Sequence, residues 1–459
     1  MQKISGFDFF SMTFDEHGTL ASDVEMDGLK TRASRATGVI FLAHGFRNDA
    51  HDANTLYTSF LSNFRAHFER PECKLLGLCD FAIAGVYWPS KALPESFPAL
   101  QGSTQSFDDD GPLLAFLSEK LNELKALTPD CSRQVDEAIQ LLPSLKTDGN
   151  AQNRFTELVS SAAKDPTPDP TEGLDALRNQ DGSTILPKLG APIVLPSAPP
   201  DADPYSGGAL SLDDSTMGSA ETLVGRLNSA LAGAAQFINL TSWWIMKNRS
   251  GVVGANGVAQ AVRGLAARNP SVQIHLVGHS LGGRVMAACA QSLAQDPLCQ
   301  PATVTLLEAA FSHYGFSADN GQGTAGFFRD VIAKKVTKGP LVATFSAQDS
   351  VVGTTYALAS RIALDNVKAI GDGNDPYGGI GRNGAIKTAE STFGKLQAAG
   401  APDGAYQFKL GVVNCLDGSG GLIKDHGDVT NPAVTYAFAS SVMSMQTEGA
   451  ETGKVLLSS

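Results

Sequence analysis

The stretch of sequence that decides the fold is SVQIHLVGHSLGGRVMAACA, residues 271–290. Its first half is an apolar run, which changes at GHSLG (278–282) into a small-residue pattern with helical spacing. A buried strand followed at once by a helix predicts a sharp corner with a serine at its apex. Such a corner leaves no room for side chains two residues before and after the apex, which explains Gly278 and Gly282.

Apolar runs of strand length recur along the chain on both sides of this corner. They lie at 7–14, 38–45, 81–88, 272–278, 302–310, 340–347 and 406–413. Helical patterns occur at 54–68, 253–268, 283–294, 354–369 and 432–445. Continuous apolar runs separated by helices are typical of strands that are buried on both faces. We therefore predict an α/β fold with a mostly parallel central sheet flanked by helices.

The interval between the strands at 81–88 and 272–278 is too long for a single helical crossover. We predict an insertion at 95–235, within a core formed by 1–94 and 236–459. The helix predicted at 111–127 carries leucines on one face, at positions 113, 114, 117, 121 and 124. We expect the helical parts of the insertion, which include further helices at 135–145 and 217–247, to form a cap over the carboxyl edge of the sheet.

One part of the insertion, residues 165–214, differs from the rest in composition. It holds nine of the chain's 23 prolines and many acidic residues, without a periodic apolar pattern. Such a segment can bury little apolar surface. We expect it to be a mobile acidic arm.

Composition limits the kinds of partner. The formal net charge is −12, and no basic cluster opposes it, so nucleic acid is not an expected partner. No run of 18 apolar residues indicates a transmembrane segment, and the N-terminus does not resemble a secretory signal. We expect a cytoplasmic protein with reduced cysteines, with export by another route left open and the oligomeric state undetermined. No spacing of cysteine or histidine indicates a metal, and no cofactor is implied.

The position of Ser280 predicts a nucleophile. Ligands bind at the carboxyl ends of the strands of an open parallel sheet, and Ser280 directly follows such an end. A serine hydroxyl needs a base to become nucleophilic. Among the eight histidines, His426 lies in a polar loop after the last predicted strand, where it can reach across strand ends. We predict His426 as the base.

A third group should orient the imidazole of the base. Asp349 directly follows the penultimate predicted strand, and Asp417, which also ends a strand, is its main competitor. We predict Asp349 as this acid. For the oxyanion we predict the backbone N–H groups of Phe46, after the strand at 38–45, and of Leu281, at the helix N-terminus. His44, Gly45 and His279 are further candidates for contact with substrate.

Four strands are each followed by a characteristic residue or motif, in the order His-Gly, Gly-His-Ser-Leu-Gly-Gly, Asp349 and His426. This order resembles the α/β-hydrolase superfamily, in particular its serine esterase and lipase branch with a His-Gly oxyanion loop. The resemblance covers about 38–90 and 236–446 and leaves out the insertion. It implies the α/β-hydrolase fold, a nucleophile at Ser280, a base at His426 and an acid at Asp349.

The expected reaction is hydrolysis of a carboxylic ester, of a small molecule or of a lipid, through an acyl-enzyme on Ser280. The acyl and alcohol groups of the substrate stay open. Three alternatives remain: a phospholipase-type effector that acts on membrane lipids, a peptidase or amidase that uses the same triad, and a non-catalytic binding module that keeps the fold.

Overall fold

The structure of the protein is a computed structural model that describes residues 2–90, 111–164, 178–190, 229–320, 323–353, 377–400 and 406–456, with side chains up to Gln446. The chain divides into two compact units. Unit 1 comprises Met1–Ser90, Arg249–Val352 and Gly378–Ser459, and unit 2 comprises Lys91–Asn248 and Gly353–Tyr377.

Unit 1 is built on a mixed sheet that is parallel except at one edge. In the described part of the chain the sheet has nine strands, in the order β1-β2-β4-β3-β5-β6-β7-β9-β8, and only β1 runs antiparallel to its neighbour. The strands are β1 Gln2–Ile4, β2 Phe7–Thr13, β3 Gly38–Ala43, β4 Phe81–Tyr87, β5 Gln273–His279, β6 Thr303–Leu307, β7 Leu341–Phe345, β8 Ser391–Lys395 and β9 Val413–Asp417. The predicted α/β class is confirmed at this level.

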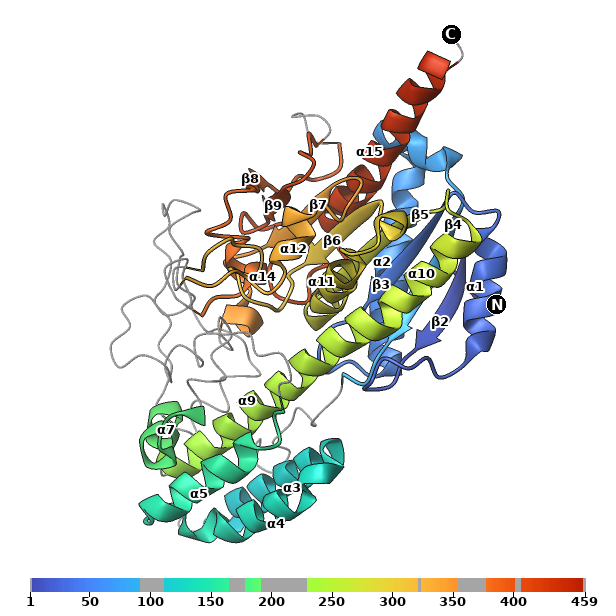
Figure 1. The fold of residues 1–459 in the computed structure, drawn as a ribbon. Helices are drawn as coiled ribbons and strands as arrows, with labels where there is room; N and C mark the ends of the chain where they lie inside the picture. Colours follow the sequence, from blue (N-terminus) through green and yellow to red (C-terminus); the bar gives the residue numbers. More distant parts are fainter. Residues whose placement is uncertain are drawn as a thin grey trace. The chain divides into compact units, whose positions relative to one another are not determined.

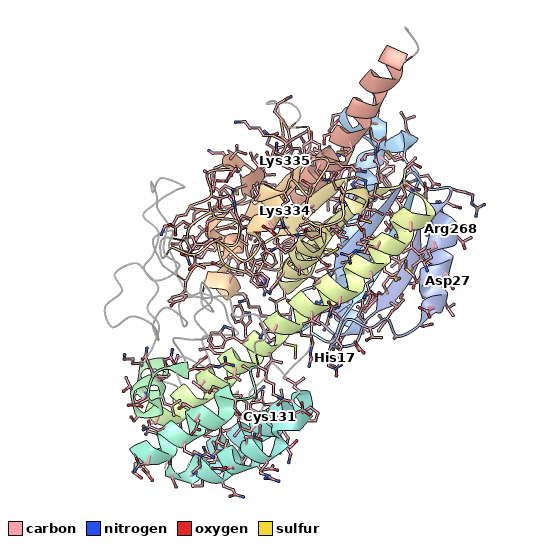
Figure 2. The ribbon with its side chains drawn as sticks, viewed as in Figure 1. His17, Asp27, Cys131, Arg268, Lys334 and Lys335 are labelled. Carbon is pink, nitrogen blue, oxygen red and sulfur yellow. The ribbon has the colours of Figure 1, made fainter. Side chains whose placement is uncertain are left out.

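Helices cover both faces of the sheet (Figure 1). The helices of unit 1 are α1 Asp23–Ala33, α2 Ala50–Ala66, α10 Ala259–Arg268, α11 Leu281–Leu293, α12 Arg329–Ala333, α14 Ile380–Asn383 and α15 Pro432–Leu456. Short 3-10 turns lie at η1 His67–Glu69, η2 Pro71–Leu78 and η7 Pro297–Cys299, and a π-helical turn, η6 Val253–Val258, precedes α10. Charged side chains of these helices, such as Asp27 of α1 and Arg268 of α10, lie on the surface (Figure 2).

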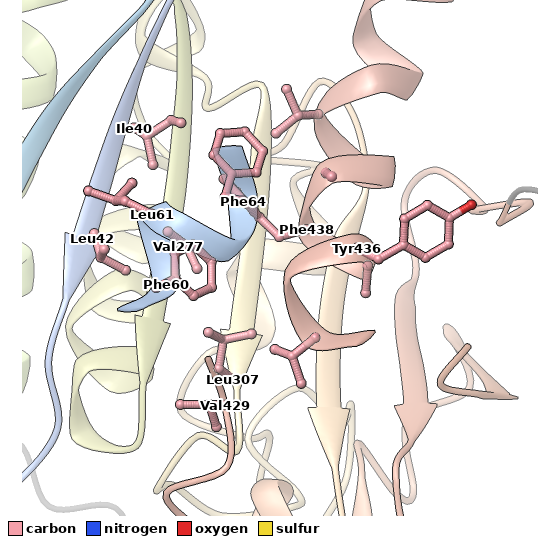
Figure 3. Packing of buried hydrophobic residues seen from close by; sticks show 14 of the residues in the cluster. Ile40, Leu42, Phe60, Leu61, Phe64, Val277, Leu307, Val429, Tyr436 and Phe438 are labelled. Carbon is pink, nitrogen blue, oxygen red and sulfur yellow. The ribbon is translucent and has the colours of Figure 1, made fainter. Parts of the chain in front are cut away.

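The core on one face of the sheet is formed where α2 and α15 meet the central strands. Phe60 and Phe64 of α2 lie beside Phe438 of α15, with ring centroids 5.5 and 5.0 Å apart, above Ile40 and Val277 (Figure 3). All five side chains are fully buried. Because α15 follows the loop that contains His426, this packing fixes the end of that loop against the sheet.

The other face of the sheet carries α11, the helix that follows Ser280. It contacts β3, β5 and β6 and packs closely against η6. A Cβ on Gly254 of η6 would lie 2.1 Å from the carbonyl oxygen of Val285, so only glycine permits this approach. The α11 helix is thus held on both sides, and its N-terminus is fixed at the end of β5.

Unit 2 contains the helices of the predicted insertion. They are α3 Gly111–Leu127, α4 Ser132–Leu141, α5 Gly149–Ser160, α7 Gly182–Leu189 and α9 Ser229–Val252, whose last turn belongs to unit 1, with 3-10 turns η3 Pro129–Cys131 and η4 Leu142–Ser144. On the leucine face of α3, Leu117, Leu121 and Leu124 are fully buried, and α3 contacts α4 and η4. The leucine face is therefore buried, at least in part, within unit 2 itself.

The predicted mobile arm is partly a packed helix. Within 165–214, helix α7 buries Ile185 and Leu186, and a Cβ on Gly233 of α9 would lie 1.8 Å from the carbonyl oxygen of Leu186. The expectation that the segment buries little apolar surface is wrong for this helix, whose apolar spacing is short and interrupted by Pro187 and so gave no periodic pattern. The remaining residues of the arm lie outside the described part of the chain.

The predicted strand at 406–413 is wrong. The strand in this region is β9, and the residues before it form a turn region instead. The side chain of Asn414 holds that region, since it accepts a hydrogen bond from the Lys409 amide at 2.9 Å and donates to the Lys409 carbonyl at 2.9 Å. The edge strands β1 and β8 were not predicted, and the helix predicted at 354–369 lies outside the described residues.

Candidate active site

Ser280 stands at the corner between β5 and α11. Its backbone has φ 58° and ψ −126°, a conformation that non-glycine residues rarely adopt. Its amide donates to the carbonyl of Leu307 at 3.0 Å, and its carbonyl accepts from the amide of Ala310 at 3.0 Å. These two bonds, to the last residue of β6 and to the segment after it, hold the serine in its strained conformation.

The glycines around Ser280 are required by space. A Cβ on Gly278 would lie 2.2 Å from the carbonyl oxygen of Gly282, and one on Gly282 would lie 2.3 Å from that of Ala43 in β3. A Cβ on Gly45 would lie 2.7 Å from the Cβ of Ser280. The structure thus agrees with the steric reason that the sequence suggested for these glycines, and it places the loop after β3 directly beside Ser280.

Asp349 and His426 lie next to each other. The Nδ1 of His426 is 2.8 Å from Oδ2 of Asp349, which is fully buried. The other carboxylate oxygen of Asp349 accepts a hydrogen bond from the amide of Val352 at 2.9 Å. Since a carboxylate only accepts, the proton of this pair sits on Nδ1 of His426, which leaves Nε2 free to act as a base. Asp417, the competitor, accepts instead from Ser419.

No hydrogen bond joins Ser280 Oγ to His426 within the part of the chain that the structure describes. His426 instead contacts His279, the residue before Ser280. The rings of His279 and His426 have centroids 4.7 Å apart, and Nε2 of His279 lies 2.8 Å from the carbonyl oxygen of His426. Catalytic hydrogen bonds are often long in the absence of substrate, so the arrangement is compatible with a Ser–His contact that forms on binding.

His44 holds the loop that follows β3. Its backbone amide is 3.0 Å from the hydroxyl of Tyr57, its carbonyl accepts from Nε1 of Trp88 at 3.0 Å, and its ring stacks on Trp88 with centroids 5.7 Å apart. The side chain is almost wholly buried, and burial lowers the pKa of His44 to about 4. The structure gives this side chain a role within the loop rather than an exposed surface for substrate, which differs from the expectation for it.

The two amides predicted to bind an oxyanion come from this loop and from α11. Neither the amide of Phe46 nor that of Leu281 has a hydrogen-bond acceptor among the described residues. The loop turns sharply after Phe46, since Arg47 has φ 62° and its amide donates to the Ser90 carbonyl at 3.1 Å. Amides without an internal acceptor, on the loop beside Ser280 and at the start of α11, are what an oxyanion site requires.

Glu308 is a residue at this edge that the sequence did not single out. It directly follows β6, has φ 43°, is fully buried, and neither of its carboxylate oxygens accepts a well-formed hydrogen bond from a described residue. Burial, and next the negative charge of Asp349, raise the pKa of Glu308 well above its usual range. The raised pKa favours a protonated carboxyl on Glu308, although a hydrogen bond with Thr344 opposes the shift, while Asp349 accepts hydrogen bonds from His426 and Val352. In the sequence, the only feature that could have pointed to Glu308 is its position directly after an apolar run of strand length.

In the part of the chain described, no group of three or more His, Cys, Asp or Glu side chains is arranged to hold a metal, and no helix is long and apolar enough to cross a membrane. Comparisons with models of protein families, with curated proteins and with solved structures found no match. The geometry of the site is therefore the basis for any functional proposal.

Proposed function

We propose that this protein is a serine hydrolase of the α/β-hydrolase type that cleaves carboxylic esters through an acyl-enzyme on Ser280. The observation that carries the proposal is the hydrogen bond of 2.8 Å between His426 and Asp349 at the edge where Ser280 occupies its strained corner. The strands that precede Ser280 and Asp349, β5 and β7, flank β6, so both residues emerge at the same edge of the sheet.

In the proposed reaction, Ser280 Oγ attacks the carbonyl carbon of the ester while Nε2 of His426 takes the hydroxyl proton. The oxyanion that forms accepts hydrogen bonds from the amides of Phe46 and Leu281, and Asp349 stabilises the positive charge on the imidazolium. The ester bond then breaks, and His426 gives its proton to the leaving alcohol. Water, deprotonated by His426, releases the acid and restores the hydroxyl of Ser280.

The ester class is tested by hydrolysis of three substrate types at equal concentration: p-nitrophenyl esters of short acids, the matching p-nitroanilides, and phosphatidylcholine vesicles. We expect the esters to be cleaved, the anilides much more slowly, and Ser280→Ala to abolish the reaction. Faster cleavage of vesicles or of anilides would replace the ester proposal by a phospholipase or an amidase. No turnover of any of the three would favour a binding module.

A further inference from the structure

His279 is the last residue of β5 and directly precedes Ser280. Its Nε2 lies 2.8 Å from the backbone carbonyl oxygen of His426. A carbonyl oxygen carries no hydrogen, so the bond exists only if Nε2 of His279 is the protonated ring nitrogen. The neutral imidazole then donates from Nε2 and leaves Nδ1 as a bare acceptor.

No donor among the described residues satisfies that acceptor. Nδ1 of His279 is buried and has no hydrogen-bond partner, and the residue as a whole is 7% exposed. An unpaired buried acceptor lowers stability, so an apolar side chain would suit this position better if packing alone mattered. Among the contacts of the ring with described residues, the hydrogen bond to the His426 carbonyl is the one that needs a histidine.

The backbone around His279 is rigid. Its neighbour Ser280 is bonded at both its amide and its carbonyl to the segment Leu307–Ala310, each at 3.0 Å. Its other neighbour, Gly278, lies so close to Gly282 that no side chain fits there. The Nε2–H donor of His279 therefore keeps a fixed position relative to Ser280.

The acceptor lies on a loop. His426 lies in the connection between β9 and α15. A second hydrogen bond holds this connection, since Ser346 Oγ donates to the Ile423 carbonyl at 3.1 Å. The Asp349 bond fixes the ring of His426 but not its main chain. Only the His279 bond links that main chain directly to the strand of the nucleophile among the described contacts of His426.

We infer that His279 is a positioning residue: its Nε2–H fixes the main chain of His426 beside the end of β5, so that the base stays close enough to Ser280 for the Ser–His contact to form when substrate binds. The inference rests on the proposed serine-hydrolase function. It gives His279 a place in the machinery other than direct contact with substrate.

The ring works in its neutral form. Burial, together with the neighbouring His426 and His44, lowers the pKa of His279 to about 3. The donor is therefore present without a charge throughout the neutral range. A second positive charge next to His426, which would oppose formation of its imidazolium, is avoided.

The test compares three variants. His279→Leu removes the donor, and His279→Gln keeps an N–H at about the same reach. His275→Leu is the matched control, since His275 is a fully buried histidine of the same strand whose ring bonds Thr303 at 3.0 Å and not His426. For a short p-nitrophenyl ester we expect His279→Leu to lower kcat about 10- to 100-fold with little change in KM, because a small displacement of the base affects only the transition state. His279→Gln should recover most of the loss, and His275→Leu should keep the wild-type kcat.

A second measurement does not depend on activity. Nitrogen-15 NMR of histidine-labelled wild-type protein should show the hydrogen of His279 on Nε2, and the Nδ1–H signal of His426 should shift in His279→Leu but not in His275→Leu. A hydrogen on Nδ1 of His279, or a folded His279→Leu with wild-type kcat, would overturn the inference. Wild-type protein that shows the NMR result but hydrolyses no ester would overturn the proposed function and leave the contact in place.

Discussion

Asp349 and His426 are 77 residues apart in the chain, and a hydrogen bond of 2.8 Å joins the Oδ2 of the first to the Nδ1 of the second. Asp349 follows β7 and His426 follows β9, the strand beside it. The side chain of Asp349 is fully buried and that of His426 is 13% exposed. A buried carboxylate thus fixes a histidine whose other nitrogen is available, the arrangement of acid and base in a catalytic triad.

Asp349→Asn is the first prediction from this pair. The single oxygen of the amide should accept from the Val352 amide, as Oδ1 of Asp349 does, so its NH2 group faces Nδ1 of His426. The wrong tautomer of His426 is then favoured, and kcat should fall by about 10³- to 10⁴-fold. Steady-state kinetics on a short p-nitrophenyl ester measure the loss. Asp417→Asn is the control, because Asp417 bonds Ser419 and not His426, and its kcat should stay within about twofold of wild type. A larger loss in the control than in Asp349→Asn would move the acid to Asp417.

The strained corner predicts that the side chain at position 280 lowers the stability of the fold. Ser280 has φ 58°, which costs about 1–3 kcal/mol for a residue with a Cβ and nothing for glycine. Glycine loses about 0.5–1 kcal/mol of this gain through its freedom in the unfolded chain. Ser280→Gly should therefore unfold in urea with a free energy about 1 kcal/mol higher than Ser280→Ala, with both variants inactive. A Ser280→Gly variant that is less stable than Ser280→Ala would mean that the corner is not strained, because only the entropy of glycine would then remain.

Much of the sheet was predictable because its central strands are buried on both faces and so consist of continuous apolar residues, as in β3, β4 and β5. The edge strand β8, Ser391–Lys395, has no fully buried residue and carries no such signal. The turn region before β9 has an alternating pattern typical of a strand. The side chain of Asn414, however, forms hydrogen bonds with the backbone amide and carbonyl of Lys409 in this region. Such a local contact between a side chain and the backbone leaves no trace in the spacing of apolar residues.

The residues of the candidate site also divide into those that a sequence pattern indicates and those that it does not. Ser280 could be predicted from a local pattern of glycines, and Asp349 and His426 from their order after strands. The contact of His279 with the His426 carbonyl could not, because it joins residues 147 apart in the chain. Glu308 gave no signal, since one acidic residue after an apolar run does not reveal that both of its oxygens are buried without a well-formed hydrogen bond from a described residue.

Glu308 predicts a dependence of stability on pH. Its pKa is raised in the folded protein, mainly by burial, so the folded state keeps a proton that the unfolded chain loses near pH 4.5. As pH rises above that value, the wild-type protein loses stability relative to Glu308→Gln by up to about 1.4 kcal/mol per pH unit, until Glu308 ionises in the folded state. Urea unfolding of both proteins at pH 5, 6 and 7 measures the difference. A difference that does not change with pH would show that Glu308 is ionised in the folded protein, or paired.

The buried leucines of α3 predict the behaviour of unit 2. Leu117 and Leu121 are fully buried, so Leu117→Asp should lower the stability of unit 2 by at least about 3 kcal/mol. Ala115→Asp is the control, because Ala115 is exposed on the same helix. Limited proteolysis should cut within 111–160 in Leu117→Asp and not in Ala115→Asp. Resistance of Leu117→Asp to cleavage would show that the leucine face is not essential to unit 2.

Labelling by a fluorophosphonate tests the central claim, that Ser280 is an activated nucleophile, most directly. The wild-type protein should gain the mass of one phosphonyl group, and peptide mapping should place it on Ser280, between Gly278 and Gly282. Ser280→Ala should gain none, and Asp349→Asn should react much more slowly. A wild-type protein that stays unlabelled, or a Ser280→Ala variant that is labelled as fast as wild type, would contradict the account.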